Sequence, residues 1–418
     1  MTGHPTLAAL RVPGLRRYLA GQLPSVTCSW AQVVALSWVV VERDPDALGW
    51  LVACQFAPSL LLGPWFGAVA DRHDRKRLLM LAEAGLGVVA GCYAVASAAG
   101  ILDLPLIFVL AVTWGVINAV DTPARRSLVP MLVPSSAAAG ASALSGTVLL
   151  VGMAAGSAVG ATLTATVGVT ITFAANAFSF FADVVLLATI RVGPSPRVRR
   201  AAGQIRDGLR HVGRTPELRA PLFALAVTAT LGFTVQVSVP IFVRVSLHGG
   251  PGLVGVGLTA VTAGGLVGAL AAAARGEPGP QALPRAALVM ATGLAVTASA
   301  PTTAVALTGL VVVGAAWSAF IAFVLAILQR GDPAMTGRVM SLFAVILLGG
   351  SAAGAPLTAA MISLAGPRAA LAVSALATLA AIAGRRALLS RPNVGGASTS
   401  SSCHERRPGP SDATPRSG

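Results

Sequence analysis

The chain has 418 residues, of which 55% are apolar or aromatic and only 11% are charged, compared with roughly 25% in soluble domains. This composition excludes an ordinary soluble enzyme. The four cysteines and five histidines follow no disulfide or metal-ligand spacing, so we expect no metal and no cofactor. The formal net charge of +15 does not indicate nucleic-acid binding, because the basic residues interrupt long apolar runs, as in the loops of membrane proteins.

Apolar runs of the length needed to cross a bilayer core of about 30 Å as helices recur along the whole chain. Twelve of them lie at 15–41, 47–70, 77–100, 104–120, 137–162, 168–190, 220–243, 252–274, 284–300, 302–328, 337–365 and 368–389. Strands of a membrane barrel would alternate apolar and polar residues, whereas these runs are apolar on every face. The sequence therefore predicts an all-α membrane protein with twelve transmembrane helices.

Lysine and arginine residues are distributed unevenly among the predicted loops. With the N-terminus inside, only Arg43, Arg244 and Arg368 of the 30 basic residues fall outside. Because Lys and Arg concentrate in cytoplasmic loops, this asymmetry predicts that both termini are cytoplasmic. Arginine predominates over lysine, and Ala and Gly abound, which is typical of a high-GC bacterium. We therefore expect a multi-pass protein of the bacterial cytoplasmic membrane.

Polar segments divide the predicted spans into two halves. Residues 191–219 carry eight arginines and separate six spans from six. Within them, QIRDGLRHVGR can form a basic amphipathic helix at the inner headgroups, and a solvated linker is an equally compatible interpretation. The C-terminal segment is rich in Ser, Pro and Gly and predicts a disordered cytoplasmic tail. The expected organisation is a cytoplasmic N-terminus, two six-helix halves around a basic linker, and the tail, at 1–14, 15–190, 191–219, 220–389 and 390–418.

The loop between the second and third spans carries the most specific motif. Its sequence, GAVADRHDRK at 67–76, resembles the signature loop of the major facilitator superfamily of transporters. The usual second Gly is replaced by Asp74, as in the enterobactin-exporter-like branch of drug efflux proteins, which the segments at 121–134, 176–180 and 336–342 also resemble. The residues that match the signature are Gly67, Asp71, Arg72, Arg75 and Lys76.

The resemblance implies a conformational latch at the cytoplasmic face. Asp71 lies at the C-terminal end of its predicted helix, where the macrodipole disfavours an anion by about 0.3–1 kcal/mol, so another group must stabilise it. In the superfamily this partner is the start of span eleven with nearby arginines, here including Arg338, and the latch holds the outward-open state. The alternative is that these basic residues are only positive-inside anchors.

Span five contains three glycines at helical spacing, Gly152, Gly156 and Gly160, which predict close helix packing. The segment GSAVGA at 156–161 also resembles a motif of drug and proton antiporters in this helix. Ser157 replaces the proline of that motif and Ala161 replaces its last glycine; the resemblance still implies antiport, and helix packing alone is the alternative.

Polar residues within the spans are functional candidates, because a charge at the bilayer centre is costly. Glu83 and Asp183 are the carboxylates found within the predicted spans, and we expect them to be coupling acids; structural pairing with an arginine is the alternative. In the similar branch an arginine follows the position of Glu83 by three residues, and here that position is Leu86. Candidates for the central cavity are Gln32, Gln55, Asn118, Gln236 and Trp317, with Trp30 and Trp38 adding aromatic area.

These features predict a secondary active transporter that exports a hydrophobic or amphipathic small molecule, such as a drug, a secondary metabolite or a siderophore. No phosphate-binding loop is present, so a proton gradient is the expected energy source for antiport. Import or facilitated diffusion of a small solute is the alternative, and a membrane sensor or scaffold is a further one. No cluster of catalytic side chains indicates an enzyme. The oligomeric state is not defined by the sequence, and a monomer is compatible with it.

Overall fold

The computed structural model describes residues 9–192, 204–330 and 333–390, and this part of the chain contains helices and turns but no strand. The predicted tail and much of the linker lie outside the described residues. The first half comprises α2 (Pro13–Arg43), α3 (Ala47–Arg72), α4 (Arg75–Ala98), α5 (Leu104–Leu128), α6 (Ala138–Thr166) and α7 (Val169–Ala188). After α8 (Gln204–Arg214), the second half comprises α9 (Pro216–Val227), η3 (Thr228–Gly232), α10 (Val235–Ser246), α11 (Pro251–Ala274), α12 (Ala282–Ser299), α13 (Thr303–Gln329), α14 (Pro333–Ala365) and α15 (Pro367–Ser390).

The helices have the length and composition of membrane spans. Among the described residues, eleven segments qualify, with α9, η3 and α10 forming one of them at Pro216–Ser246. Helix α3 contributes a shorter apolar stretch, Ala47–Gly63. The prediction of an all-α membrane protein is therefore confirmed, while the crossing of the membrane by α3 as a twelfth span stays a prediction.

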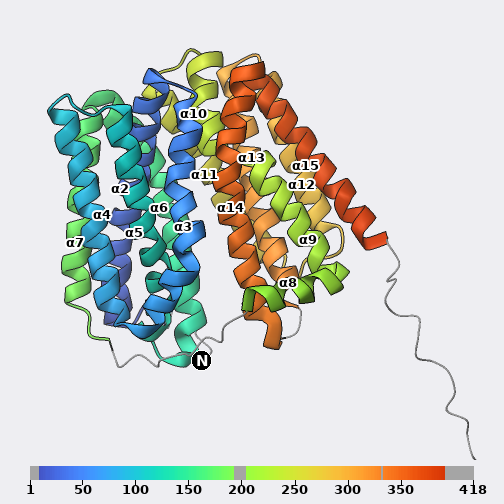
Figure 1. Ribbon diagram of the computed structural model, residues 1–418, viewed down its shortest axis with the longest axis horizontal. Coiled ribbons are helices and arrows are strands. Elements are labelled where there is room, and N and C mark those ends of the chain that lie inside the picture. Colours follow the sequence, from blue (N-terminus) through green and yellow to red (C-terminus); the bar gives the residue numbers. More distant parts are fainter. Residues whose placement is uncertain (1–8, 193–203, 331–332, 391–418) are drawn as a thin grey trace, which may run out of the picture.

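The two halves form separate bundles that lie side by side (Figure 1). In the first half, α2 packs against α6 and α7, and α4 packs against α5 and α7. In the second half, α13 packs against α11 and α12, and α15 packs against α9 and α12. The halves meet mainly through two helix pairs, α6 with α11 and α3 with α14, and α2 and α3 make smaller contacts with α10. Between the two main contacts, the halves leave a space, which is described below as the central cavity.

The bundle has two different ends. The linker end holds α8 and the turn between α3 and α4, and the far end holds the turns at 44–46, 167–168 and 247–250 (Figure 1). At the far end, one buried apolar cluster joins Leu36 and Leu51 of the first half to Val237, Ile241 and Ala355 of the second. At the linker end, the clusters belong to one half each. The halves are therefore sealed against each other at the far end.

Small residues allow this seal. A side chain carbon added at Gly49 of α3 would lie 2.6 Å from the carbonyl oxygen of Ala355 and 2.6 Å from the Ala359 Cβ of α14. An added carbon at Gly255 of α11 would overlap Ala161 of α6. Glycine is thus required at both contacts between the halves, as is common where membrane helices approach closely.

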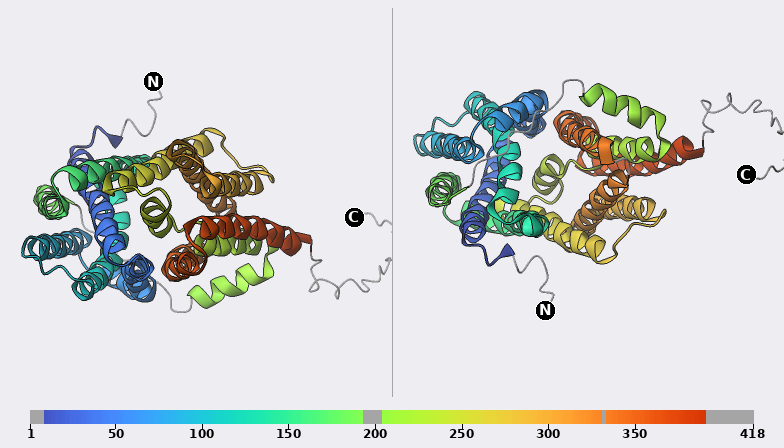
Figure 2. Two further views of the ribbon diagram at one scale, coloured as in Figure 1. Left: turned by 90° about the horizontal axis from the view of Figure 1, so that it is seen from above. Right: turned by 90° about the horizontal axis from the view of Figure 1, so that it is seen from below.

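Helix α10 occupies the centre of the far end, between the two halves (Figure 2). Seven consecutive residues of it, Val237–Val243, are buried, which a helix achieves only when neighbours surround it on every face. It is separated from α9 by the π-helical turn η3 and by the non-helical residues Phe233 and Thr234. The apolar run at 220–243 predicted a span, and Pro216–Ser246 qualifies as one, but the interruption within it was not predicted. Gly232 and the β-branched and aromatic residues that follow it have low helix propensity, which favours the interruption.

Candidate functional site

A cavity of about 370 Å³ lies between the halves, next to the interruption between η3 and α10. The first half lines it with Trp30, Val52, Phe56, Leu150 and Met153, all of them apolar or aromatic. The second half supplies residues of η3–α10, α11, α13 and α14. Among the described residues that line the cavity, none is acidic, basic or histidine. Such a cavity accommodates an uncharged and largely apolar molecule.

The polar side chains of the cavity all come from the second half. They are Thr234, Gln236, Thr262, Ser318 and Ser351. Thr262 and Ser351 donate hydrogen bonds to carbonyls of their own helices at 2.9 and 3.1 Å, and the Thr234 hydroxyl lies 2.8 Å from that of Thr358. Within the described part of the chain, the Gln236 amide and the Ser318 hydroxyl have no side-chain hydrogen bond. These two groups are available to a bound molecule.

Aromatic rings line the cavity from both halves. The rings of Phe233 and Trp317 are stacked, with centroids 4.3 Å apart and planes at 9°. Trp317 in turn stacks near Phe320 at 6.1 Å. Trp30 and Phe56 belong to the first half and complete the aromatic lining. Aromatic walls of this kind bind flat apolar groups without requiring charge.

The remaining polar candidates lie elsewhere. The Gln32 side chain accepts a hydrogen bond from the Asn176 amide at 2.9 Å, which joins α2 to α7 inside the first half. Gln55 on α3 and Asn118 on α5 are half-buried and are not among the residues that line the cavity. Trp38 lies at the far end, where the Arg244 guanidinium of α10 stands over its ring at 5.7 Å. This contact adds a cation–π interaction to the seal between the halves.

A buried charged cluster occupies the first half. Arg125 of α5 forms an ion pair with Glu83 of α4, and its Nη2 lies 3.2 Å from Asp121 Oδ1, one turn earlier on α5. Its Nη1 lies 3.9 Å from Asp183 Oδ2 of α7. The Glu83 side chain is 0% exposed and the Asp183 side chain 1% exposed. Three carboxylates thus surround one guanidinium away from water, an arrangement with more acid than base.

Sequence reasoning missed Asp121 and Arg125. The predicted fourth span ended at residue 120, where the hydropathy falls, whereas α5 continues to Leu128 and carries both residues into the bundle. The spacing of Asp121 and Arg125 by four residues places them on one helix face, and this signal could have identified the pair. Arg125 also supplies Glu83 with the counter-charge that Leu86 does not provide.

Small and polar residues of α2 complete the cluster. A side chain carbon at Gly21 would overlap the carboxylate of Asp183, so glycine at this position admits that side chain. The Ser25 hydroxyl donates to Glu83 Oε2 at 3.5 Å. The cluster therefore ties α2, α4, α5 and α7 together.

The signature loop is organised locally by Asp74 and Lys76. The Asp74 carboxylate caps α4 by accepting hydrogen bonds from the backbone amides of Lys76 and Arg77 at 2.9 and 3.2 Å. The Lys76 ammonium donates to the carbonyls of Ala188 and Ile190 at 2.9 and 2.7 Å, where a cation stabilises the C-terminal end of α7.

The other residues assigned to the latch are placed less completely. Arg75 is buried, and its Nη1 lies 3.2 Å from the sulfur of Met131. Arg338 is half-buried near the start of α14. The surroundings of Gly67 and the side chains of Asp71 and Arg72 lie outside what the structure describes. The interaction of Asp71 with α14 therefore stays a prediction.

The glycines of α6 face α2. Side chain carbons at Gly152, Gly156 and Gly160 would meet Val26, the carbonyl of Thr27 and Ala31 within 2.8 Å. The adjacent face of the same helix, at Ser157 and Ala161, meets Gly255 of α11. Small residues on two faces of α6 thus allow it to pack closely against α2 and against α11 of the other half.

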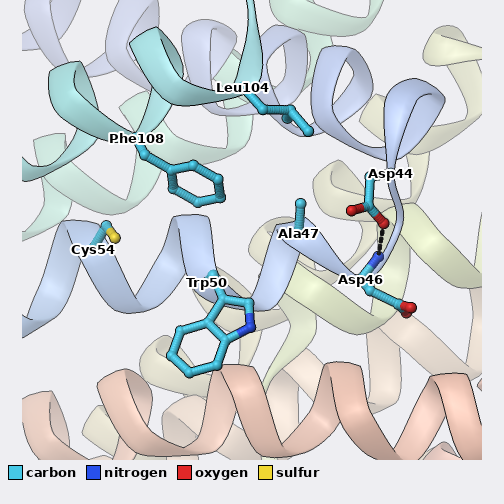
Figure 3. Close-up of a pocket in the computed structure, with 7 residues that line it drawn as sticks. All are labelled: Asp44, Asp46, Ala47, Trp50, Cys54, Leu104 and Phe108. Atoms are coloured by element: carbon cyan, nitrogen blue, oxygen red, sulfur yellow. Dashed lines mark hydrogen bonds between the residues drawn. The ribbon is translucent and has the colours of Figure 1, made fainter.

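A second, shallow pocket of about 460 Å³ lies at the far end, beside the turn between α2 and α3. Figure 3 shows Asp44 and Asp46 on one side of it and Phe108, Leu104 and Trp50 around the other. The Asp46 amide donates to Asp44 Oδ1 at 3.0 Å, which organises the turn. Its residues come from the first half alone, so it is not part of the space between the halves.

Two helix bundles around a central cavity without charged lining residues are typical of membrane transporters of the major facilitator superfamily. The model of the transmembrane secretion effector family of this superfamily matches residues 4–411, and the chain belongs to this family. The confirmed assignment agrees with the resemblance carried by the loop at 67–76.

Curated relatives are similar over parts of their length. The staphyloferrin A transporter of Staphylococcus aureus (strain NCTC 8325 / PS 47) is 23% identical over 247 residues, which is 58% of this chain and 62% of that protein. Macrolide efflux protein A of Streptococcus pyogenes is 30% identical over 119 residues, 28% of this chain and 29% of that protein. The chain thus spans less than two thirds of these relatives.

Solved structures share the fold at low identity. The nucleoside transporter NupG has a TM-score of 0.71 at 10% identity and covers 91% of this chain and 100% of its own. A bacterial homolog to the human lysosomal transporter Spinster, in an inward-facing and unoccupied conformation, has a TM-score of 0.67 at 14% identity, covering 90% of this chain and 95% of its own. The D-xylose-proton symporter has a TM-score of 0.67 at 16% identity, with coverage of 90% and 95%.

Proposed function

We propose that this protein is a secondary active transporter that exports an uncharged hydrophobic or amphipathic small molecule across the bacterial cytoplasmic membrane by alternating access. The observation that carries this proposal is the cavity between the halves, which lacks charged lining residues and is sealed at the far end. With the predicted orientation, the far end faces outward, so cargo enters from the cytoplasm. Opening of the far end and closure of the linker end then release it outside.

The family to which the chain belongs, and one of its relatives, favour export over import. Its family is described as secretion effectors, and one relative is a macrolide efflux protein. Import remains the competing function, because proteins of the same fold include proton symporters. A sensor or scaffold does not require a cavity that is lined by residues of both halves.

The latch at the linker end belongs to this cycle. Asp71 and the start of α14, with Arg338, would hold the linker end closed while the far end is open. In the sealed arrangement described above, the far-end contacts at Gly49 and Gly255 have the corresponding role. In the proposed cycle the two ends would be held closed in turn, the linker end by Asp71 and α14 and the far end by the contacts of Gly49 with α14 and of Gly255 with α6.

The buried charged cluster is the proposed coupling site. Glu83, Asp121 and Asp183 share one arginine. The repulsion between carboxylates at short range is relieved when one of them binds a proton. Proton binding and release in the first half would then change how Arg125 is divided among its acidic partners. This rearrangement can alter the packing of α2, α4, α5 and α7, which all contact the cluster.

The test is transport by the full-length protein in proteoliposomes with an imposed proton gradient. We expect a neutral amphipathic cargo to accumulate against its gradient, and Glu83→Gln or Asp183→Asn to abolish this component while cargo exchange without a gradient persists. Normal uphill transport by both variants would exclude them as coupling acids. Accumulation only in the opposite direction would establish import.

A further inference from the structure

The central cavity is polar on one side only. All five of its polar side chains belong to the second half, and the first half contributes only apolar and aromatic surface. Two of the five, Thr234 and Gln236, lie where the helical hydrogen-bond ladder is interrupted at Phe233 and Thr234. Interrupted membrane helices often supply such polar groups at the midplane sites of transporters.

We propose that the cargo is a neutral amphipath with a flat apolar body, bound with its hydrogen-bonding end on Gln236 and Ser318 and its body against Trp30 and Phe56. This inference rests on the proposed function and specifies its substrate class. Gln236 lies one residue into α10, and Ser318 lies on α13 beside Gly265 of α11. An added carbon at Gly265 would lie 2.9 Å from the Ser318 hydroxyl, so glycine leaves room for that hydroxyl between α11 and α13.

The hydrogen-bonding chemistry of Gln236 and Ser318 determines which functional group the cargo can carry at its polar end. The Gln236 amide both donates and accepts, and so does the Ser318 hydroxyl. A cargo amide, hydroxyl or carbonyl can pair with them without leaving a charge unbalanced. A carboxylate or an ammonium would enter an apolar cavity with no counter-charge among the described residues, which is strongly unfavourable.

The two sides of the cavity therefore have different tasks. The apolar side contributes affinity that does not depend on the cargo end group, whereas Gln236 and Ser318 discriminate between end groups. Removal of Gln236 leaves a buried cargo group without its partner, and we expect binding of a neutral amide to weaken about tenfold. Truncation of the Trp30 side chain removes apolar contact surface, and we expect the affinity for every ligand to fall by a similar factor.

The experiment measures binding to the full chain in lipid nanodiscs, without any gradient. Three pyrene probes share the ring and a short alkyl linker and end in an amide, a carboxylate or an ammonium. Energy transfer from tryptophan to pyrene reports binding, and protein-free nanodiscs correct for partitioning into lipid. We expect the amide to bind at least tenfold more tightly than either charged probe.

Variants separate the two sides of the cavity. Gln236→Leu and Ser318→Ala should each reduce the preference for the amide, and Trp30→Leu should weaken all three probes while the preference remains. Gln55→Leu makes the same replacement outside the cavity lining and should change neither. Equal or tighter binding of a charged probe, an unchanged preference in Gln236→Leu, or absence of amide binding would overturn the proposal.

Transport assays keep the two proposals distinguishable. If the amide probe binds as expected but is not moved in proteoliposomes, the substrate class stands and the transport function fails. If a charged molecule is moved and competes with the amide probe at Gln236, transport stands and the inference about a neutral cargo fails.

Discussion

Replacement of Gly49 by alanine should open the far end of the transporter. The added carbon would lie 2.6 Å from the Ala355 carbonyl oxygen, 2.6 Å from the Ala359 Cβ and 3.0 Å from the Pro356 Cα. All three atoms belong to the backbone or to a Cβ of α14, so no flexible side chain can move aside. The substitution therefore disfavours the sealed arrangement and leaves an arrangement with separated far ends unaffected.

The magnitude follows from the cost of overpacking a tight contact. Added carbons in well-packed interiors cost about 1–3 kcal/mol, which shifts a two-state equilibrium about five- to 150-fold. The matched control is Gly91→Ala on α4, where an added carbon has no neighbour within 4 Å. Both positions are helical, so changes in helix propensity cancel between them.

Cysteine accessibility measures this shift. Ser351 lines the cavity, and Ser351→Cys in a background without the native cysteines should react slowly with a membrane-impermeant maleimide added outside intact cells. With Gly49→Ala the reaction should accelerate, and with Gly91→Ala it should not. Equal labelling rates for the two variants would refute the assignment of the α3–α14 contact as the far-end seal.

Three further predictions concern the linker end and the orientation. Asp71→Asn should insert and fold yet lose most transport, because the amide keeps the shape of the carboxylate without its charge; transport at the parental rate would reduce Asp71 to a topological marker. Asp74→Ala should lower stability by about 1 kcal/mol in thermal unfolding through loss of the α4 cap, and Asp74→Asn should not, since asparagine also caps helices; identical melting of the two would exclude the cap. Cysteines introduced at 246–250 should react with impermeant reagent only from outside and those at 209–214 only from inside, and the reverse pattern would invert the orientation.

The sequence predicts the fold class well, because long apolar runs have only one stable form in a bilayer. The sequence does not predict those features of the fold that depend on how the two halves pack together. The run at 220–243 is predominantly apolar on both sides of Phe233 and Thr234, so its hydropathy gives no sign of the interruption there. The interruption is favoured by weak local helix propensity and by the placement of α10 between the halves, and only the first of these is visible in the sequence.

The residues of the candidate site were likewise predicted only in part from the sequence. Polarity within a span identifies Gln236 and Gln32 alike, yet one lines the cavity and the other pairs with Asn176 between α2 and α7. The direction in which a polar side chain points depends on helix rotation, which a run that is apolar on every face does not specify. Arg125 was missed because the loss of hydropathy after residue 120 marks a change of composition and not the end of α5.

Uphill movement of a neutral amphipath by the purified protein tests the central claim most directly. In proteoliposomes of defined protein orientation, the amide-terminated pyrene probe would be followed after a proton gradient is imposed, with Asp71→Asn as the inactive comparison. The account predicts gradient-dependent movement in the direction that corresponds to export, abolished by a protonophore and by the variant. Movement equal to that of protein-free liposomes, or movement unaffected by the protonophore, would contradict it.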